Sequence, residues 1–191
     1  MDCSPTGSSV HGILQRGRAK AVNFGIVYGI GAFSLSKDIG VTRKEAEQYI
    51  NNYLAAYSGV DSYLKACIEN AKADGYVTTL FGRRRYLPEL TASNHAIRAF
   101  GERVARNAPI QGTAADIIKI AMVKVAERIE RENLDAALIL QVHDELIVEC
   151  KEQIKDYVCV LLKEEMESAA NLLVELKVDV GCGKSWFEAK N

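Results

Sequence analysis

The sequence predicts an α+β protein, in which a mainly helical first half precedes a half that combines strands with helices. Apolar side chains recur at helical spacing from Thr113 to about Glu132, which predicts a long helix. Two strand-like runs, Ala136 to Val142 and Leu146 to Cys150, flank a tight polar turn. From Val174 to Val180 apolar residues alternate with charged ones, as in a half-buried antiparallel strand. The 191 residues fit one large domain or two small ones.

The first half begins with a short Ser/Gly-rich segment, residues 1–15, that carries no pattern and is expected to be an unrelated or disordered leader. A helical pattern follows from Arg16 to Tyr28 and breaks at Gly29 and Gly31. The capping box that Thr42 opens predicts a helix from Arg43 to about Tyr57, which ends at Ser58-Gly59. A further helix is expected from Val60 to Ala73.

Shorter elements complete the prediction. Tyr76 to Leu80 and Arg84 to Leu87 form a strand and its return strand around a Phe81-Gly82 turn. Asn94 to Asn107 predicts a helix that Pro109 closes, because proline lacks the backbone N–H that a helix needs. A last helix is expected from Glu152 to Ala170.

The charge is unevenly distributed although the net charge is −1. Residues 1–110 carry 14 Lys and Arg against 9 Asp and Glu, whereas residues 111–191 carry 10 against 16. A basic surface beside an acidic one suits a protein that binds a polyanion and also holds metal ions. The alternative is that the two halves have solvated helix faces whose charges differ by chance.

Composition excludes several classes of protein. No apolar run reaches the roughly 18–20 residues that span a bilayer, and no signal peptide is present, so a cytoplasmic protein without a membrane partner is expected. The five cysteines form no C-x-x-C pair and are odd in number, which argues against a zinc site and against disulfide partners.

Three local patterns carry possible chemistry. Arg16, Lys20, Phe24 and Tyr28 recur every four residues and share one helix face, with the cations towards the N-terminal end that already favours phosphate. The aromatic rings would stack on a base or sugar, although an amphipathic helix that buries them is the alternative.

The second pattern is the polar turn that holds His143, Asp144 and Glu145. A hairpin tip fixes the position of a carboxylate, and hard oxygen ligands suit Mg²⁺. A merely solvated acidic turn is the alternative.

The third pattern is a set of Arg and amide side chains that suit contacts with phosphate and the minor groove. Solvated basic faces are the alternative reading. The set consists of Arg83, Arg84, Arg103, Asn107 and Gln111.

The residue order of these segments resembles that of family A DNA polymerases of the bacterial DNA polymerase I type. Arg16 to Gly29 is similar to the family's nucleotide-binding helix, R-x3-K-x6-7-Y-G, and Gln141 to Glu145 to its metal motif. Glu102 to Asp116 and Gly82 to Pro88 resemble its template-primer contacts. The resemblance implies a partial right-hand fold, with a fingers subdomain over residues 16–90 and the C-terminal part of the palm over residues 91–191.

The resemblance also implies roles in template-directed DNA synthesis from deoxynucleoside triphosphates on primer-template DNA. Arg16 and Lys20 would hold the triphosphate, Phe24 would lie by the sugar, and Tyr28 near the nascent base pair. The phenylalanine resembles members that discriminate against sugars lacking a 3′-hydroxyl. The catalytic residues implied are Asp144, which binds Mg²⁺, with Glu145, Lys20 and His143.

One departure from the family pattern stands out. No segment resembles the D-Y-S-x-x-E-like strand that carries the family's second metal-binding aspartate, so a fragment with nucleotide and DNA binding is expected. A non-catalytic DNA-binding remnant is the alternative, and the single-subunit RNA polymerases are the rival enzyme class.

Overall fold

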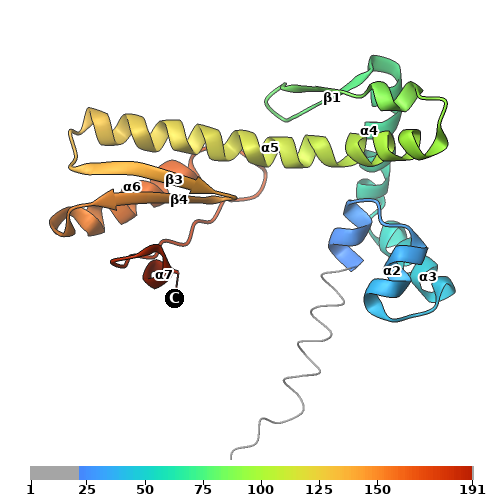
Figure 1. The fold of residues 1–191 in the computed structure, drawn as a ribbon, viewed down its shortest axis with the longest axis horizontal. Coiled ribbons are helices and arrows are strands. Elements are labelled where there is room, and N and C mark those ends of the chain that lie inside the picture. The colour runs from blue at the N-terminus through green and yellow to red at the C-terminus, as the bar shows by residue number, and fades with distance from the viewer. Residues whose placement is uncertain (1–21, 191) are drawn as a thin grey trace, which may run out of the picture. The chain divides into compact units, whose positions relative to one another are not determined.

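The computed structural model describes residues 22–190, which form helices and two small antiparallel sheets (Figure 1). The predicted α+β class is confirmed. The chain divides into two compact units between Ile110 and Gln111, so that the described residues 22–110 belong to the first unit and 111–190 to the second. Within the described range, no helix is both long and apolar enough to cross a membrane.

The first unit consists of helices and one short hairpin. After a helical stretch over residues 22–27 it contains α2 (Ala32–Ile39), α3 (Arg43–Ala56), α4 (Ser58–Asp74), β1 (Tyr76–Thr78), β2 (Arg84–Tyr86), the 3-10 turn η1 (Pro88–Thr91) and the beginning of α5 (His95–Arg131).

The predicted capping box is confirmed, since the Glu45 N–H donates to Thr42 Oγ1 over 3.3 Å and the Thr42 N–H to the Glu45 carboxylate over 2.8 Å. The predicted hairpin is also confirmed, with Val77 opposite Arg85.

Two details of this unit differ from the prediction. Ser58 and Gly59 do not separate two helices but open α4, because the single residue Tyr57 (φ −113°, ψ 59°) already breaks the chain direction. Helix α2 was not predicted. Its buried residues Leu35 and Ile39 lie one turn apart and pack with Ala46, in a segment that is too short to show a clear period.

The expectation that Pro109 closes a helix was wrong. Helix α5 runs without interruption through Pro109, and the boundary between the two units falls one residue beyond it, after Ile110. Proline fixes φ near the helical value, but inside a helix it removes one hydrogen bond and its ring clashes with the preceding turn. The buried positions on both sides, Ala105 and Ala121 among them, supply packing that outweighs this loss.

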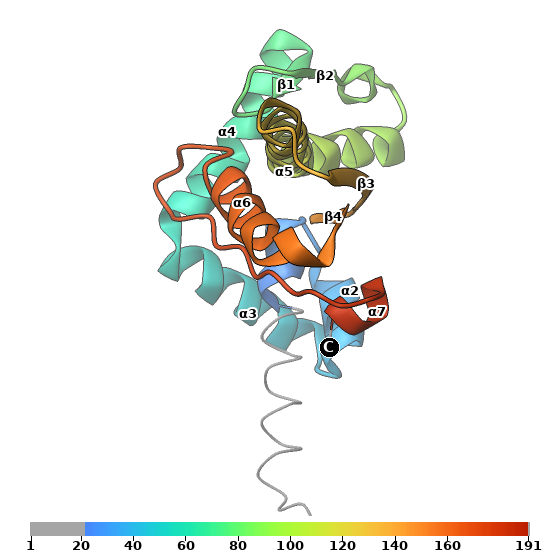
Figure 2. The ribbon, with the colours of Figure 1, turned by 90° about the vertical axis from the view of Figure 1, so that its left-hand side faces the viewer.

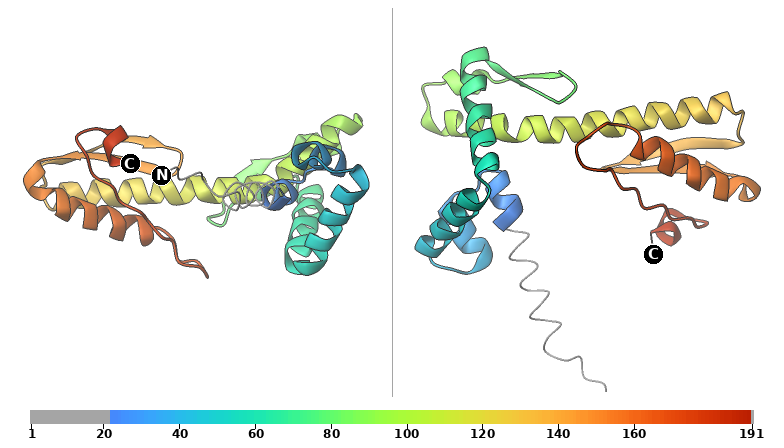
Figure 3. Two further views of the ribbon diagram at one scale, coloured as in Figure 1. Left: turned by 90° about the horizontal axis from the view of Figure 1, so that it is seen from below. Right: turned by 180° about the vertical axis from the view of Figure 1, so that it is seen from behind.

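The second unit packs a hairpin and one helix onto the rest of α5 (Figure 3). Its elements are β3 (Ala136–Val142), β4 (Glu145–Cys150), the 3-10 turn η2 (Glu152–Ile154), α6 (Lys155–Glu167) and the short α7 (Trp186–Ala189). Val125 and Ile129 of α5 meet Leu161 of α6, and Leu146 and Val148 of β4 pack against them. This core holds the hairpin in place.

A charged cluster joins α5 to α6 beside that core. Arg128 Nη1 donates to Glu164 over 2.6 Å and to Glu165 over 3.0 Å, while its Nε donates to Glu132 over 3.1 Å. The Tyr157 hydroxyl donates to the same Glu132 over 2.5 Å. These hydrogen bonds to carboxylates raise the pKa of Arg128 and fix the two helices in register.

The predicted strand from Val174 to Val180 was wrong, since this segment forms neither helix nor strand (Figure 2). Its alternation is nevertheless visible, because Leu176 and Val178 are half-buried whereas Lys177 and Asp179 are exposed. A strand needs a neighbour, and β3 and β4 pair only with each other in the described sheets. The Val178 N–H donates instead to a side chain, Glu167 Oε1, over 3.1 Å.

Truncation of the second core should lower the stability of the chain. Leu161 is 0% exposed, so Leu161→Ala is expected to reduce the free energy of unfolding by about 3 kcal/mol. Its neighbour Val160 is 52% exposed, and Val160→Ala should change that free energy by less than about 0.5 kcal/mol. Urea unfolding of the two variants measures the difference. Equal effects would contradict the packing described.

Candidate functional site

The acidic turn is the tip of the β3–β4 hairpin. Val142 is paired with Glu145, so only His143 and Asp144 connect the strands. His143 has φ +54°, a left-handed backbone conformation that is uncommon for a residue with a side chain. Gln141 Nε2 donates to the His143 carbonyl over 2.6 Å. The turn therefore holds Asp144 in an exposed and defined position.

Glu145 is bound by the end of the chain. Lys190 Nζ lies 2.7 Å from Glu145 Oε1, and the Trp186 indole N–H donates to Oε2 over 3.3 Å. The hydrogen bond from Lys190 lowers the pKa of Glu145 below its ordinary value of 4.5, and Trp186 and His143 lower it further against the opposing effect of desolvation. The carboxylate is thus already charged and partnered.

The residues of the turn fit a metal ion only in part. Asp144 and Glu145 offer the hard oxygens that Mg²⁺ prefers. Between residues 22 and 190, however, no three His, Cys, Asp or Glu side chains gather into a group that could hold a metal. A site for two divalent ions needs more ligands than this pair provides.

The aromatic residues of the helical pattern lie at a helix end in the first unit. Arg16 and Lys20 lie outside the described residues. Phe24 and Tyr28 are 52% and 39% exposed, and their rings stack with centroids 6.2 Å apart and an angle of 21° between the planes. They present a continuous aromatic surface, not the buried packing of the alternative.

A glycine turn fixes the end of this helix. The Ile30 N–H donates to the Gly25 carbonyl over 2.7 Å and the Gly29 N–H to the Ile26 carbonyl over 3.0 Å, with Gly29 at φ +77°. This pair of bonds is a Schellman motif. A Cβ atom on Gly29 would lie 2.9 Å from Arg106 Nη1, so a side chain here would displace the end of Arg106.

The basic residues lie on two elements. Arg83 and Arg84 are exposed on the β1–β2 hairpin, where the Arg84 guanidinium lies 4.6 Å from the Tyr76 ring centre. Arg103 is exposed on α5, and Asn107 lies one turn further along it with a buried Oδ1 that has no hydrogen-bond partner in the described part. Gln111 is exposed in the second unit.

The comparisons with known proteins agree along most of the chain. The sequence model of DNA polymerase family A matches residues 8–188. The chain belongs to this family. It is 53% identical to DNA polymerase I of Bacillus subtilis (strain 168) over 176 residues and 51% identical to that of Geobacillus stearothermophilus, covering 92% of this chain and 20% of each relative. The chain therefore spans about a fifth of the length of these relatives.

A solved structure of the family is also similar. The POL domain of Pol1 from M. smegmatis, in complex with DNA primer-template and dNTP, matches with a TM-score of 0.87 and 43% identity, covering 91% of this chain and 31% of that one. The predicted partial right-hand polymerase fold is confirmed. Family A DNA polymerases depend in general on metal ions. The roles of single residues and the subdomain boundary at residues 90/91 stay predictions.

The sequence predicted the helix break at Gly29, since glycine is the usual residue after a helix end. It did not predict the proximity of Arg106 to Gly29 or the contacts of Trp186 and Lys190 with Glu145. These residues lie far apart in the chain, and no local pattern marks their contacts.

The contact between Glu145 and the C-terminal helix should depend on pH. Because the pKa of Glu145 is lowered, the contact is complete above pH 4.5 and is lost as the pH falls through the lowered value. Trp186 is the only tryptophan, so its fluorescence should report a transition with a midpoint below 4.5. Lys190→Ala should move the midpoint upwards, and Glu145→Gln should abolish the transition. A transition that persists in Glu145→Gln would refute the assignment.

Proposed function

We propose that this chain forms part of a template-directed DNA polymerase that adds deoxynucleotides to a primer 3′ end. The observation that carries this proposal is the match, over 91% of the chain, to a polymerase domain in complex with primer-template and dNTP. In the reaction, the primer 3′-oxygen bonds to the α-phosphorus, and the bond from that phosphorus to the β-phosphate oxygen breaks. Pyrophosphate leaves, and the hydroxyl proton passes to solvent.

The first unit binds the incoming nucleotide in this proposal. Arg16 and Lys20 hold the triphosphate, Phe24 lies by the sugar, and Tyr28 lies near the nascent base pair. The exposed, parallel stack of Phe24 and Tyr28 supports this role, because such rings offer a flat surface to a base. The Gly29 turn positions Tyr28 as the last residue before the chain changes direction.

The second unit supplies the carboxylates. Asp144 holds Mg²⁺, Glu145 supports it, and His143 lies near the primer end. A bound ion supplies positive charge that stabilises the charge developing on the phosphate oxygens. The two-residue loop supports the assignment, because it fixes Asp144 in an exposed position at the tip of the hairpin.

DNA binding completes the proposal. The exposed cations of the β1–β2 hairpin and of α5, together with two amide side chains of α5, contact the primer-template without reading its sequence. The residues proposed for this are Arg83, Arg84, Arg103, Asn107 and Gln111. The fingers and palm assignment and a cytoplasmic location belong to the same proposal.

A non-catalytic DNA-binding role is the second candidate. Two observations favour it: Glu145 is occupied by Lys190 and Trp186, and residues 22–190 contain no group of three metal-ligating side chains. Such a chain would bind DNA and nucleotide but would not add the nucleotide to the primer.

Primer extension separates the two candidates. Given primed template, deoxynucleotides and Mg²⁺, the chain should extend the primer slowly, because the described residues supply only part of a ligand set. Asp144→Asn should abolish extension, whereas Glu149→Gln, which removes an exposed charge from the same hairpin, should not. Binding of DNA without incorporation would support the non-catalytic role instead.

A measurement that is independent of activity tests the metal ligand. Mn²⁺ is expected to broaden the backbone amide NMR signals of residues 142–146, because a paramagnetic ion bound at Asp144 lies next to them. Asp144→Asn should abolish this broadening and Glu149→Gln should leave it unchanged. Broadening that is equal in both variants would remove Asp144 from the site.

The proposed DNA contacts predict a salt dependence. Removal of one phosphate contact by Arg103→Ala should weaken duplex binding and reduce the slope of log K against log salt by about 0.9. Arg43 is also exposed but lies outside the proposed contacts, so Arg43→Ala should leave the slope unchanged. Fluorescence anisotropy with a labelled primer-template measures both. A slope that falls equally in the two variants would indicate unspecific attraction.

A further inference from the structure

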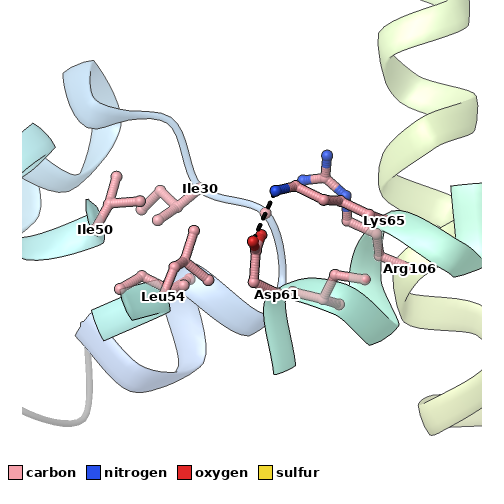
Figure 4. A pocket seen from close by; sticks show the side chains of 9 residues that line it. Ile30, Ile50, Leu54, Asp61, Lys65 and Arg106 are labelled. Carbon is pink, nitrogen blue, oxygen red and sulfur yellow. Dashed lines mark hydrogen bonds and ion pairs between the residues drawn. The ribbon is translucent and has the colours of Figure 1, made fainter. Parts of the chain in front are cut away.

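A cavity of ≈ 250 Å³ lies within the first unit (Figure 4). Its lining comes from the helical stretch before Gly29, from the chain just after it, and from α3, α4 and α5. The lining residues are Ile26, Gly29, Ile30, Ile50, Leu54, Asp61, Leu64, Lys65 and Arg106. None of the polymerase roles proposed above uses this cavity.

One part of the lining is apolar. Five aliphatic side chains from four segments contribute to it: Ile26, Ile30, Ile50, Leu54 and Leu64. The volume equals that of roughly eight water molecules at about 30 Å³ each. That space suits one six-membered ring with a short side chain, and an apolar ring gains more than water does from an aliphatic wall.

The other part carries charge that is not balanced. Lys65 Nζ and Asp61 Oδ2 form an ion pair of 2.7 Å and satisfy each other. Arg106 remains, and its buried Nε has no hydrogen-bond partner among the residues described. Arginine keeps its charge at every relevant pH, and a buried donor without an acceptor is unfavourable. The lining therefore carries an excess of one positive charge on the Arg106 guanidinium, whose Nε is itself enclosed by protein atoms.

We propose that this cavity binds a small molecule that joins an apolar ring to a carboxylate. The carboxylate accepts hydrogen bonds from the planar Arg106 guanidinium, which matches its geometry. The ring covers the Ile and Leu side chains of the apolar part. Free phosphate would satisfy Arg106 but would leave the apolar part uncovered. The inference does not rest on the proposed polymerase function, since it uses neither the carboxylates of the turn nor the aromatic stack.

The probe for this site is 3-phenylpropanoate, with 3-phenylpropanamide as its neutral analogue. Titration into the ¹⁵N-labelled chain should shift the amide signals of residues that line the cavity, with a dissociation constant of about 1–10 mM. The amide should bind at least tenfold more weakly, and inorganic phosphate should not shift these signals. Equal binding of acid and amide, or binding of phosphate alone, would overturn the proposal.

Two variants and a control locate the site. Arg106→Gln should weaken binding of the acid at least tenfold and leave binding of the amide unchanged. Leu54→Phe fills the apolar part without changing any charge and should abolish binding of both. Arg43→Gln removes an exposed arginine of α3 that does not line the cavity, and should bind like the unmodified chain. If Arg106→Gln does not fold, Leu54→Phe decides, and retained binding in that variant would place the probe elsewhere.

Discussion

The pairing of β3 with β4 imposes the constraint on which the acidic site depends. The ladder continues to Val142 and Glu145, so two residues must reverse the chain. His143 accepts the left-handed backbone that such a short loop requires, and Asp144 is exposed as a consequence. The hairpin is itself held by Leu146, which packs with the core around Leu161. The position of the carboxylate is therefore fixed by apolar packing at some distance along the strands.

The two units handle charge in different ways. In the second unit Arg128 is surrounded by three carboxylates, which cancel its positive charge and leave part of the unit's acidic excess in the cluster itself. In the first unit exposed arginines lie on a hairpin and a helix, with Arg84 resting on Tyr76. Stacking on a ring orients a guanidinium without cancelling its charge, so it remains attractive to a polyanion.

The sequence predicted those elements that depend only on residues close together in the chain. The capping box at Thr42, the hairpins and the long apolar period of α5 were all readable, because cap geometry and side-chain period depend on neighbours in the sequence. The helix end predicted at Pro109 was wrong, because packing on both sides outweighs the loss that the proline causes. The strand predicted over Val174–Val180 was wrong, because alternation shows only which side chains face inwards, whereas a strand also needs a partner strand. The contact of Trp186 with Glu145 spans 41 positions and could not be read locally.

Two separate constraints act on Gly29, one on its backbone φ and one on the space beside its Cα atom. They differ in how they depend on the chirality of the residue. Its φ of +77° is uncommon for L-residues, and a Cβ atom in the L position would lie 2.9 Å from Arg106 Nη1, so that the end of this side chain would have to move. A D-alanine would satisfy the first demand and would direct its methyl group to the opposite side of the backbone. Glycine has no Cβ atom and meets both demands, whereas an encoded replacement would strain the backbone and displace the Arg106 side chain.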